Sequence, residues 1–217
     1  MICTTHSPVF LDIAERQQSL VRVSKDESRD VKISQVSKNL FSREERSDEK
    51  DRLRVLASFH PTVNEVFFAK RVVLFEESSA IAAFETAAEL TGLFQRTARV
   101  RRDATLIDCD GKASITLFQQ VLNHFAIPYT VIYDEDPDNQ DSARETQKIR
   151  ELLTESTFFV LNPDLEGVLG YDRPGRNKPY VAVKKIEELH KAGSIPEQFL
   201  RAMNWVYFGR DSEPVAN

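Results

Sequence analysis

Short apolar runs alternate with helical patterns through the second half of the chain. The runs lie at residues 72–75, 106–107, 129–133 and 157–161. Between them, apolar residues recur at helical spacing over 81–90 and 115–122, and a polar helix is expected over 143–153. Alternating buried strands and helices are typical of βαβ units. The sequence therefore predicts an α/β fold, with parallel strands near 72–76, 105–109, 129–133 and 157–161 and helices on both faces.

The rest of the chain shows weaker patterns. Residues 20–23 alternate as in a strand, and the polar stretch 24–30 is typical of a loop. A narrow apolar stripe within the charged segment 37–59 predicts a mostly exposed helix that ends before Pro61. Two helices are expected over 180–208, and the second begins near Pro196 and buries Phe199, Met203 and Val206.

Composition and charge narrow the function classes. The 217 residues carry 29 Lys and Arg against 34 Asp and Glu, a net charge of −5, so contact with nucleic acid would need a local basic patch. A candidate patch is the run Arg99, Arg101 and Arg102, for which a solvated surface is the alternative. With only Cys3 and Cys109, neither a disulfide framework nor a zinc site is expected. No segment could span a bilayer, and a cytoplasmic location is expected.

Acidic residues follow every predicted strand of the sheet. They are Glu76 and Glu77, Asp108 and Asp110, Asp134 to Asp136, and Asp164 with Glu166. Because parallel strands end at one sheet edge, where α/β proteins bind ligands, these carboxylates would repel one another unless cations neutralise them. Hard oxygen ligands suit Mg²⁺ or Mn²⁺, and two such ions can hydrolyse a phosphodiester. The alternative is that these acids are ordinary solvated turn residues.

Two of these strand ends resemble the Toprim family, in which a glutamate ends the first strand and Asp-x-Asp ends a later one. The matching segments are Val72 to Glu76 and Val131 to Asp136. Residues 53–190 further resemble the Toprim region of OLD-family (overcoming lysogenisation defect) ATP-dependent endonucleases. That resemblance rests on Phe67-Phe68-Ala69-Lys70, Asp110-Gly111-Lys112, Leu165-Glu166 and Asn177-Lys178-Pro179.

The resemblance implies a metal-dependent DNA endonuclease or nickase that uses two Mg²⁺ or Mn²⁺ ions. Glu76 would be a metal ligand or acid/base, and Asp134, Asp136 and Glu166 would be further ligands. Lys178 would stabilise the transition state; without the resemblance, its sequence context indicates an ordinary surface lysine.

The chain departs from the family pattern directly after the first strand. The family has a glycine and then a second acid one turn later, where this sequence has Glu77 and Ala80. Since alanine cannot bind a metal, Glu77 or Asp110 could complete the ligand set. The alternative function is a catalytically weakened Toprim that serves as a DNA-binding or assembly module. Toprim chemistry with a covalent tyrosine is less favoured, because no separate tyrosine-bearing domain is present.

The first residues resemble a different part of the same family. The segment from Thr4 to Pro8 is similar to the switch-histidine segment of an ABC-type ATPase, in which His6 would sense the terminal phosphate of ATP. No nucleotide-binding G-x-x-x-x-G-K-[ST] loop occurs, so we expect an upstream ATPase domain to bind ATP, and the resemblance allows a homodimer through that part. The expected organisation is an ATPase tail (1–30), a helical arm or linker (31–65), the Toprim domain (66–170) and helices packed on it (171–217).

Overall fold

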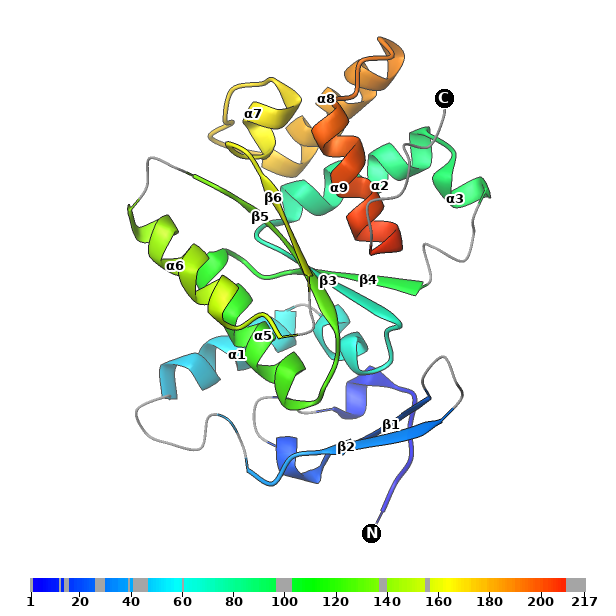
Figure 1. Ribbon diagram of the computed structural model, residues 1–217, viewed down its shortest axis with the longest axis vertical. Coiled ribbons are helices and arrows are strands. Elements are labelled where there is room, and N and C mark those ends of the chain that lie inside the picture. Colours follow the sequence, from blue (N-terminus) through cyan, green and yellow to red (C-terminus); the bar gives the residue numbers. More distant parts are fainter. Residues whose placement is uncertain are drawn as a thin grey trace.

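The computed structural model shows a parallel sheet between two groups of helices, with a small hairpin beside it (Figure 1). The structure describes residues 2–11, 13, 16–25, 30–38, 40, 47–59, 61–96, 103–136, 140–154 and 157–209. The strands are β1 (Val21–Lys25), β2 (Val31–Gln35), β3 (Arg71–Phe75), β4 (Ala104–Asp108), β5 (Tyr129–Asp134) and β6 (Thr157–Leu161). The α-helices are α1 (Ser47–Phe59), α2 (Ser78–Leu90), α3 (Leu93–Arg96), α5 (Lys112–His124), α6 (Gln140–Glu151), α7 (Leu165–Leu169), α8 (Lys178–Lys191) and α9 (Glu197–Phe208). Short 3-10 turns are η1 (Pro8–Phe10), η2 (Gln17–Ser19) and η4 (Pro61–Phe67).

The central sheet confirms the predicted α/β Toprim fold. Its strand order is β4-β3-β5-β6, and all three pairings are parallel. The strands lie within one residue of the predicted ranges at nearly every end. Every residue of β5 is buried, as expected for a central strand covered on both faces. All four strands therefore end at the same edge of the sheet.

Helices cover the two faces of the sheet in separate groups (Figure 1). One core cluster contains Val72, Phe118 and Phe125 and lies on the side of α1, α5 and α6. The other contains Phe75, Phe84 and Phe199 and lies on the side of α2, α8 and α9. Phe84 stacks on Phe199 with ring centroids 4.3 Å apart. These phenylalanines are core residues, as the sequence pattern indicates.

The N-terminal third differs from the sequence expectation at one point. Residues 31–35 were expected in a helical arm or linker, but they form β2, which pairs antiparallel with β1. The cause is the alternation of polar and β-branched residues in this segment, which suits a strand better than a helix. Ile13 and Val36 are buried in the same core cluster as α5, so the segment packs on the sheet domain.

The C-terminal helices α8 and α9 form as predicted. Alpha-helix α8 packs lengthwise on α2, and α9 buries Phe199, Met203 and Val206. None of the helices within the described residues is long and apolar enough to cross a membrane.

Candidate functional site

The candidate site lies where the strand order of the parallel sheet switches from one side of β3 to the other. Strand β3 is flanked by β4 on one side and β5 on the other, so the connections from these strands diverge and leave a crevice at their carboxyl ends. Glu76 follows β3 and Asp134 ends β5. The two are neighbours, because the Asp134 backbone N–H donates to Glu76 Oε2 at 3.3 Å. The structure therefore brings together two acids that are 58 residues apart in the sequence.

Asp134 is the most strongly perturbed acid of this edge. Its residue is 7% exposed, and Oδ1 accepts a hydrogen bond from the Leu165 N–H at 3.1 Å. Burial, followed by the charges of Glu76, Asp136, Glu166 and Asp164, raises the pKa of Asp134 to about 8. Burial also raises the pKa of Glu76, and the nearby Lys112 charge offsets only part of this rise. A cation bound at this place would favour the ionised form of both acids, so their clustering suits a cation-binding site.

Glu166 gives independent evidence for such a place. It lies in the first turn of α7 and is 3% exposed, yet neither of its carboxylate oxygens has a hydrogen-bond partner. Arg173 Nε lies 4.0 Å from Oε1, beyond hydrogen-bonding distance. Burial raises the pKa of Glu166. A buried carboxylate without partners is costly, so these oxygens fit the role of cation ligands.

Lys112 occupies the centre of the acidic edge. Its side chain is 5% exposed, and Nζ lies 2.8 Å from Asp136 Oδ2 and 3.9 Å from Glu76 Oε2. Nζ also donates to Ser142 Oγ, and this hydroxyl in turn donates to Asp136 Oδ2 at 3.1 Å. The charge of Asp136 is thus compensated by the Lys112 ammonium.

Glu77 and Lys178 form a second ion pair at this edge. Lys178 begins α8, and its Nζ donates to Glu77 Oε2 at 2.7 Å. Glu77 Oε1 accepts from Ser79 Oγ at 2.7 Å, so both carboxylate oxygens are engaged. The structure thus places the predicted catalytic lysine next to the predicted ligands, held by Glu77. Ala80 is buried in α2 and contributes no polar group.

Two other predicted residues, Asp110 and His6, are exposed rather than buried. Asp110 is exposed, in a left-handed turn with φ 55° after β4. His6 is exposed, and its ring contacts Phe68 edge-on at 6.3 Å between centroids. Arg99, Arg101 and Arg102 lie outside the described residues, so the suggested DNA contact there stays a prediction. Two further acids have local structural roles: Asp164 caps α7, and Asp108 accepts from the Asp110 N–H.

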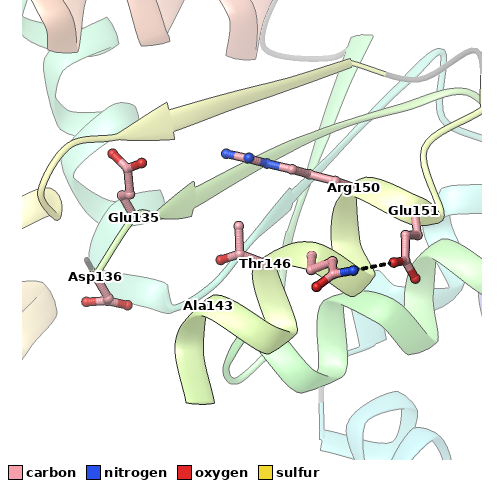
Figure 2. A pocket seen from close by; sticks show the side chains of 7 residues that line it. Glu135, Asp136, Ala143, Thr146, Arg150 and Glu151 are labelled. Atoms are coloured by element: carbon pink, nitrogen blue, oxygen red, sulfur yellow. Dashed lines mark hydrogen bonds between the residues drawn. The ribbon is translucent and has the colours of Figure 1, made fainter. Parts of the chain in front are cut away.

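A groove runs from the acidic edge along α6 (Figure 2). Glu135 and Asp136 line one end, and the Arg150 side chain extends toward them from the other, above Thr146. Arg150 Nε donates to the Tyr133 hydroxyl at 3.1 Å, and its guanidinium lies over the Phe158 ring. Thr146 Oγ1 is buried without a hydrogen-bond partner. The groove therefore joins the carboxylates to a positioned guanidinium.

The donor set fits a hard divalent cation in chemistry but is not closed around one. Mg²⁺ and Mn²⁺ prefer carboxylate oxygens, which are supplied here by Glu76, Asp134, Asp136 and Glu166. The Glu166 oxygens, which have no hydrogen-bond partner, suit a cation ligand. Within the described ranges, no three His, Cys, Asp or Glu side chains converge closely enough to hold a metal ion as they stand. Binding therefore requires rotation of carboxylates, and Asp136 would have to leave Lys112.

Sequence reasoning assigned no role to several residues that shape this site. Lys112, Ser142 and Arg173 were not among the candidates, and Arg150 was placed only in a polar helix. The available signal for Lys112 was its position directly after Gly111, at the start of the helix that follows a strand end. That position points a side chain at the carboxyl edge, but its acidic partners are distant in sequence.

Comparison with known proteins finds a family match for part of the chain and two relatives. Residues 67–136 match the family described as overcoming lysogenization defect protein-like, TOPRIM domain. The chain is 30% identical over 201 residues to a protein of Thermus scotoductus named OLD nuclease, which covers 83% of this chain but only 36% of that protein. It is also 28% identical over 85 residues to an uncharacterized protein of Archaeoglobus fulgidus, covering 36% of this chain and 82% of that protein.

The chain thus spans about a third of the length of its Thermus relative. The matched residues include Glu76, Lys112, Asp134 and Asp136, which meet at the carboxyl edge of the sheet. The family match thus covers the part of the chain that forms this edge, and residues 67–136 are an OLD-like TOPRIM domain.

Proposed function

We propose that this chain is the divalent-metal-dependent nuclease part of a longer protein and hydrolyses phosphodiester bonds of DNA. The observation that carries the proposal is the buried, under-compensated acidic edge formed by Glu76, Asp134 and Glu166. Such carboxylates are costly for stability alone, which favours a role in binding cations. The name of the Thermus relative, OLD nuclease, supports the same reaction class.

Some residues at the edge would bind the metal, and another would stabilise negative charge on the phosphate. Glu76, Asp134, Asp136 and Glu166 would hold the metal, with two ions expected once substrate is bound. Bound Mg²⁺ or Mn²⁺ would lower the pKa of a water molecule and stabilise the charge on the leaving oxygen. Lys178, 2.7 Å from Glu77, would turn its ammonium to a non-bridging phosphate oxygen as negative charge develops there.

The groove along α6 offers a path for the DNA strand that leaves the cleavage point. A phosphate in this groove would meet the Arg150 guanidinium, which the Tyr133 hydroxyl orients. Contacts to phosphates position a strand without reading its sequence, so this path predicts binding with little sequence preference.

ATP would act through the part of the longer protein that precedes the Toprim region. The resemblance of residues 4–8 to a switch-histidine segment and the small share of the Thermus relative that the chain covers support this proposal. His6 is exposed, so its ring is accessible to a nucleotide that the rest of the ATPase domain would hold. The Toprim part would then cut under control of the ATPase part.

A plasmid assay tests the proposed activity. Supercoiled DNA is incubated with the chain in Mg²⁺, Mn²⁺ or EDTA, and nicked and linear products are quantified. We expect cleavage with metal and none with EDTA, and loss of cleavage in Asp134→Asn. The matched control is Asp141→Asn, which neutralises an exposed acid on α6 and should cut at the wild-type rate. Equal cleavage by Asp134→Asn and the wild type would refute the site.

A second candidate function is a weakened Toprim that binds DNA without cutting it. The specific observations in its favour are Ala80 at the family's acid position and the engagement of Glu77 by Lys178 and Ser79. Glu77 is therefore not free to replace the missing acid without breaking this ion pair. If the wild type binds DNA but never cuts, while Ala80→Glu cuts, the second function holds.

A further inference from the structure

Lys112 is a buried cation surrounded by the side chains that would bind metal. Its ammonium contacts Asp136 Oδ2 at 2.8 Å, the Ser142 hydroxyl, and Glu76 Oε2 at 3.9 Å, and it lies 5.9 Å from the centroid of the Tyr133 ring. Two carboxylates, a hydroxyl and an aromatic ring together form a typical cation environment. The lysine thus does at this point what a metal ion would do.

The backbone before Lys112 fixes this placement. Gly111 adopts φ 104°, a region that side chains disfavour, and its N–H donates to the Glu76 carbonyl at 2.7 Å. The Cys109 N–H donates to the Phe75 carbonyl at 3.0 Å. The turn that starts α5 is therefore tied to the end of β3, and the first residue of α5 is held over the acidic edge. Lys112 reaches this position through a defined turn rather than from a mobile loop.

A divalent ion bound by Asp136 and Glu76 would compete directly with this ammonium. Carboxylate oxygens bind Mg²⁺ at about 2.0–2.1 Å, so an ion on Asp136 Oδ2 would lie within a few ångströms of Nζ. Two cations at that separation repel strongly where water is excluded. By contrast, the Glu166 oxygens without hydrogen-bond partners belong to α7, whose Leu165 N–H donates to Asp134 Oδ1 at 3.1 Å, and Arg173 Nε lies 4.0 Å from Glu166 Oε1.

We propose that Lys112 is an internal counter-cation whose ammonium occupies the position of a second divalent ion. The chain without DNA therefore binds one divalent ion tightly. The first ion binds on the Asp134 and Glu166 side. A second ion binds Asp136 only when Lys112 leaves it. Lys112 is thus a positioning residue that controls how many ions are bound. This inference rests on the proposed metal-dependent function.

Direct metal binding tests this role without any cleavage assay. The full chain is titrated with Mn²⁺, and free Mn²⁺ is measured by electron paramagnetic resonance. We expect one tight site in the wild type. In Lys112→Met we expect a second site whose affinity rises by at least about tenfold, because the competing charge is gone. Lys112→Gln removes the charge but keeps a donor for Asp136 and Ser142, so it should give the same change even where the methionine variant folds poorly.

Control variants separate this role from general charge effects. Lys148→Gln removes an exposed lysine that contacts Glu145 at 2.8 Å, and it should bind Mn²⁺ like the wild type. Two tight sites in the wild type, or unchanged or weaker second-site binding in both Lys112 variants, would overturn the inference. If Mn²⁺ binds and Asp134→Asn abolishes it while Lys112 variants change nothing, only the counter-cation role fails. If Mn²⁺ does not bind at all, the proposed function fails with it.

Discussion

Neutralising Asp134 should make the metal-free protein more stable near neutral pH. The change is Asp134→Asn, which keeps the shape of the side chain and an oxygen that can accept from the Leu165 N–H. In the wild type, this buried carboxyl sits among Glu76, Asp136, Glu166 and Asp164, so ionising it in the folded state is unfavourable. The amide carries no charge and avoids this cost.

The size and sign of the effect follow from the pKa. Burial raises the pKa of Asp134 to about 8 in the folded chain, against about 3.9 for an unfolded aspartate. The folded state then binds more protons than the unfolded state between these values, so the stabilising contribution is full below about pH 4 and is lost as the pH rises to about 8. At pH 7 the difference of about three pH units corresponds to about 4 kcal/mol, and we expect about 2–4 kcal/mol in favour of Asp134→Asn.

Chemical unfolding in EDTA at pH 4 to 8 measures this difference. The wild type should lose stability as the pH rises, whereas the variant should lose less and should match the wild type at the acidic end. Added Mg²⁺ should stabilise the wild type by binding its folded form and should have little effect on the variant. Asp141→Asn is the control and should follow the wild type. A variant that is equal to or less stable than the wild type at pH 7 in EDTA would refute the reasoning.

Three further predictions concern Lys178, Arg150 and the two cysteines. Lys178→Ala should slow plasmid cleavage by about 10²–10³-fold with Mn²⁺ binding unchanged, and equal rates would exclude a transition-state role. Arg150→Ala should weaken binding of single-stranded DNA in a fluorescence anisotropy titration and reduce its salt dependence, whereas an unchanged salt dependence would contradict the strand path along α6. Cys109 is buried and burial raises the pKa of its thiol, so iodoacetamide at pH 8 should label the exposed Cys3 and leave Cys109 unmodified until the chain unfolds, as mass spectrometry would show.

The sequence alone determined the layers of the fold and the edge at which the site lies. Continuous apolar runs separated by helical patterns predict a parallel sheet covered on both faces, because both patterns are local properties of the sequence. Carboxyl ends of parallel strands share one edge, so the proximity of Glu76 and Asp134 followed from topology. The strand at 31–35 was missed, since an alternation of only five residues is a short signal that is decided by its pairing with β1.

Only the tertiary structure decided which lysine pairs with which carboxylate at the site. Lys112 reaches Asp136 across 24 residues, and Lys178 reaches Glu77 across 101. These pairs depend on how α5 and α8 leave their turns and pack on the sheet, and no local pattern encodes that path. Burial is equally non-local: Glu166 in the first turn of α7 is buried by the packing of the fold, and its oxygens have no hydrogen-bond partners. Charge and burial together decide the chemistry of carboxylates, and both arise from contacts between segments that are distant in the sequence.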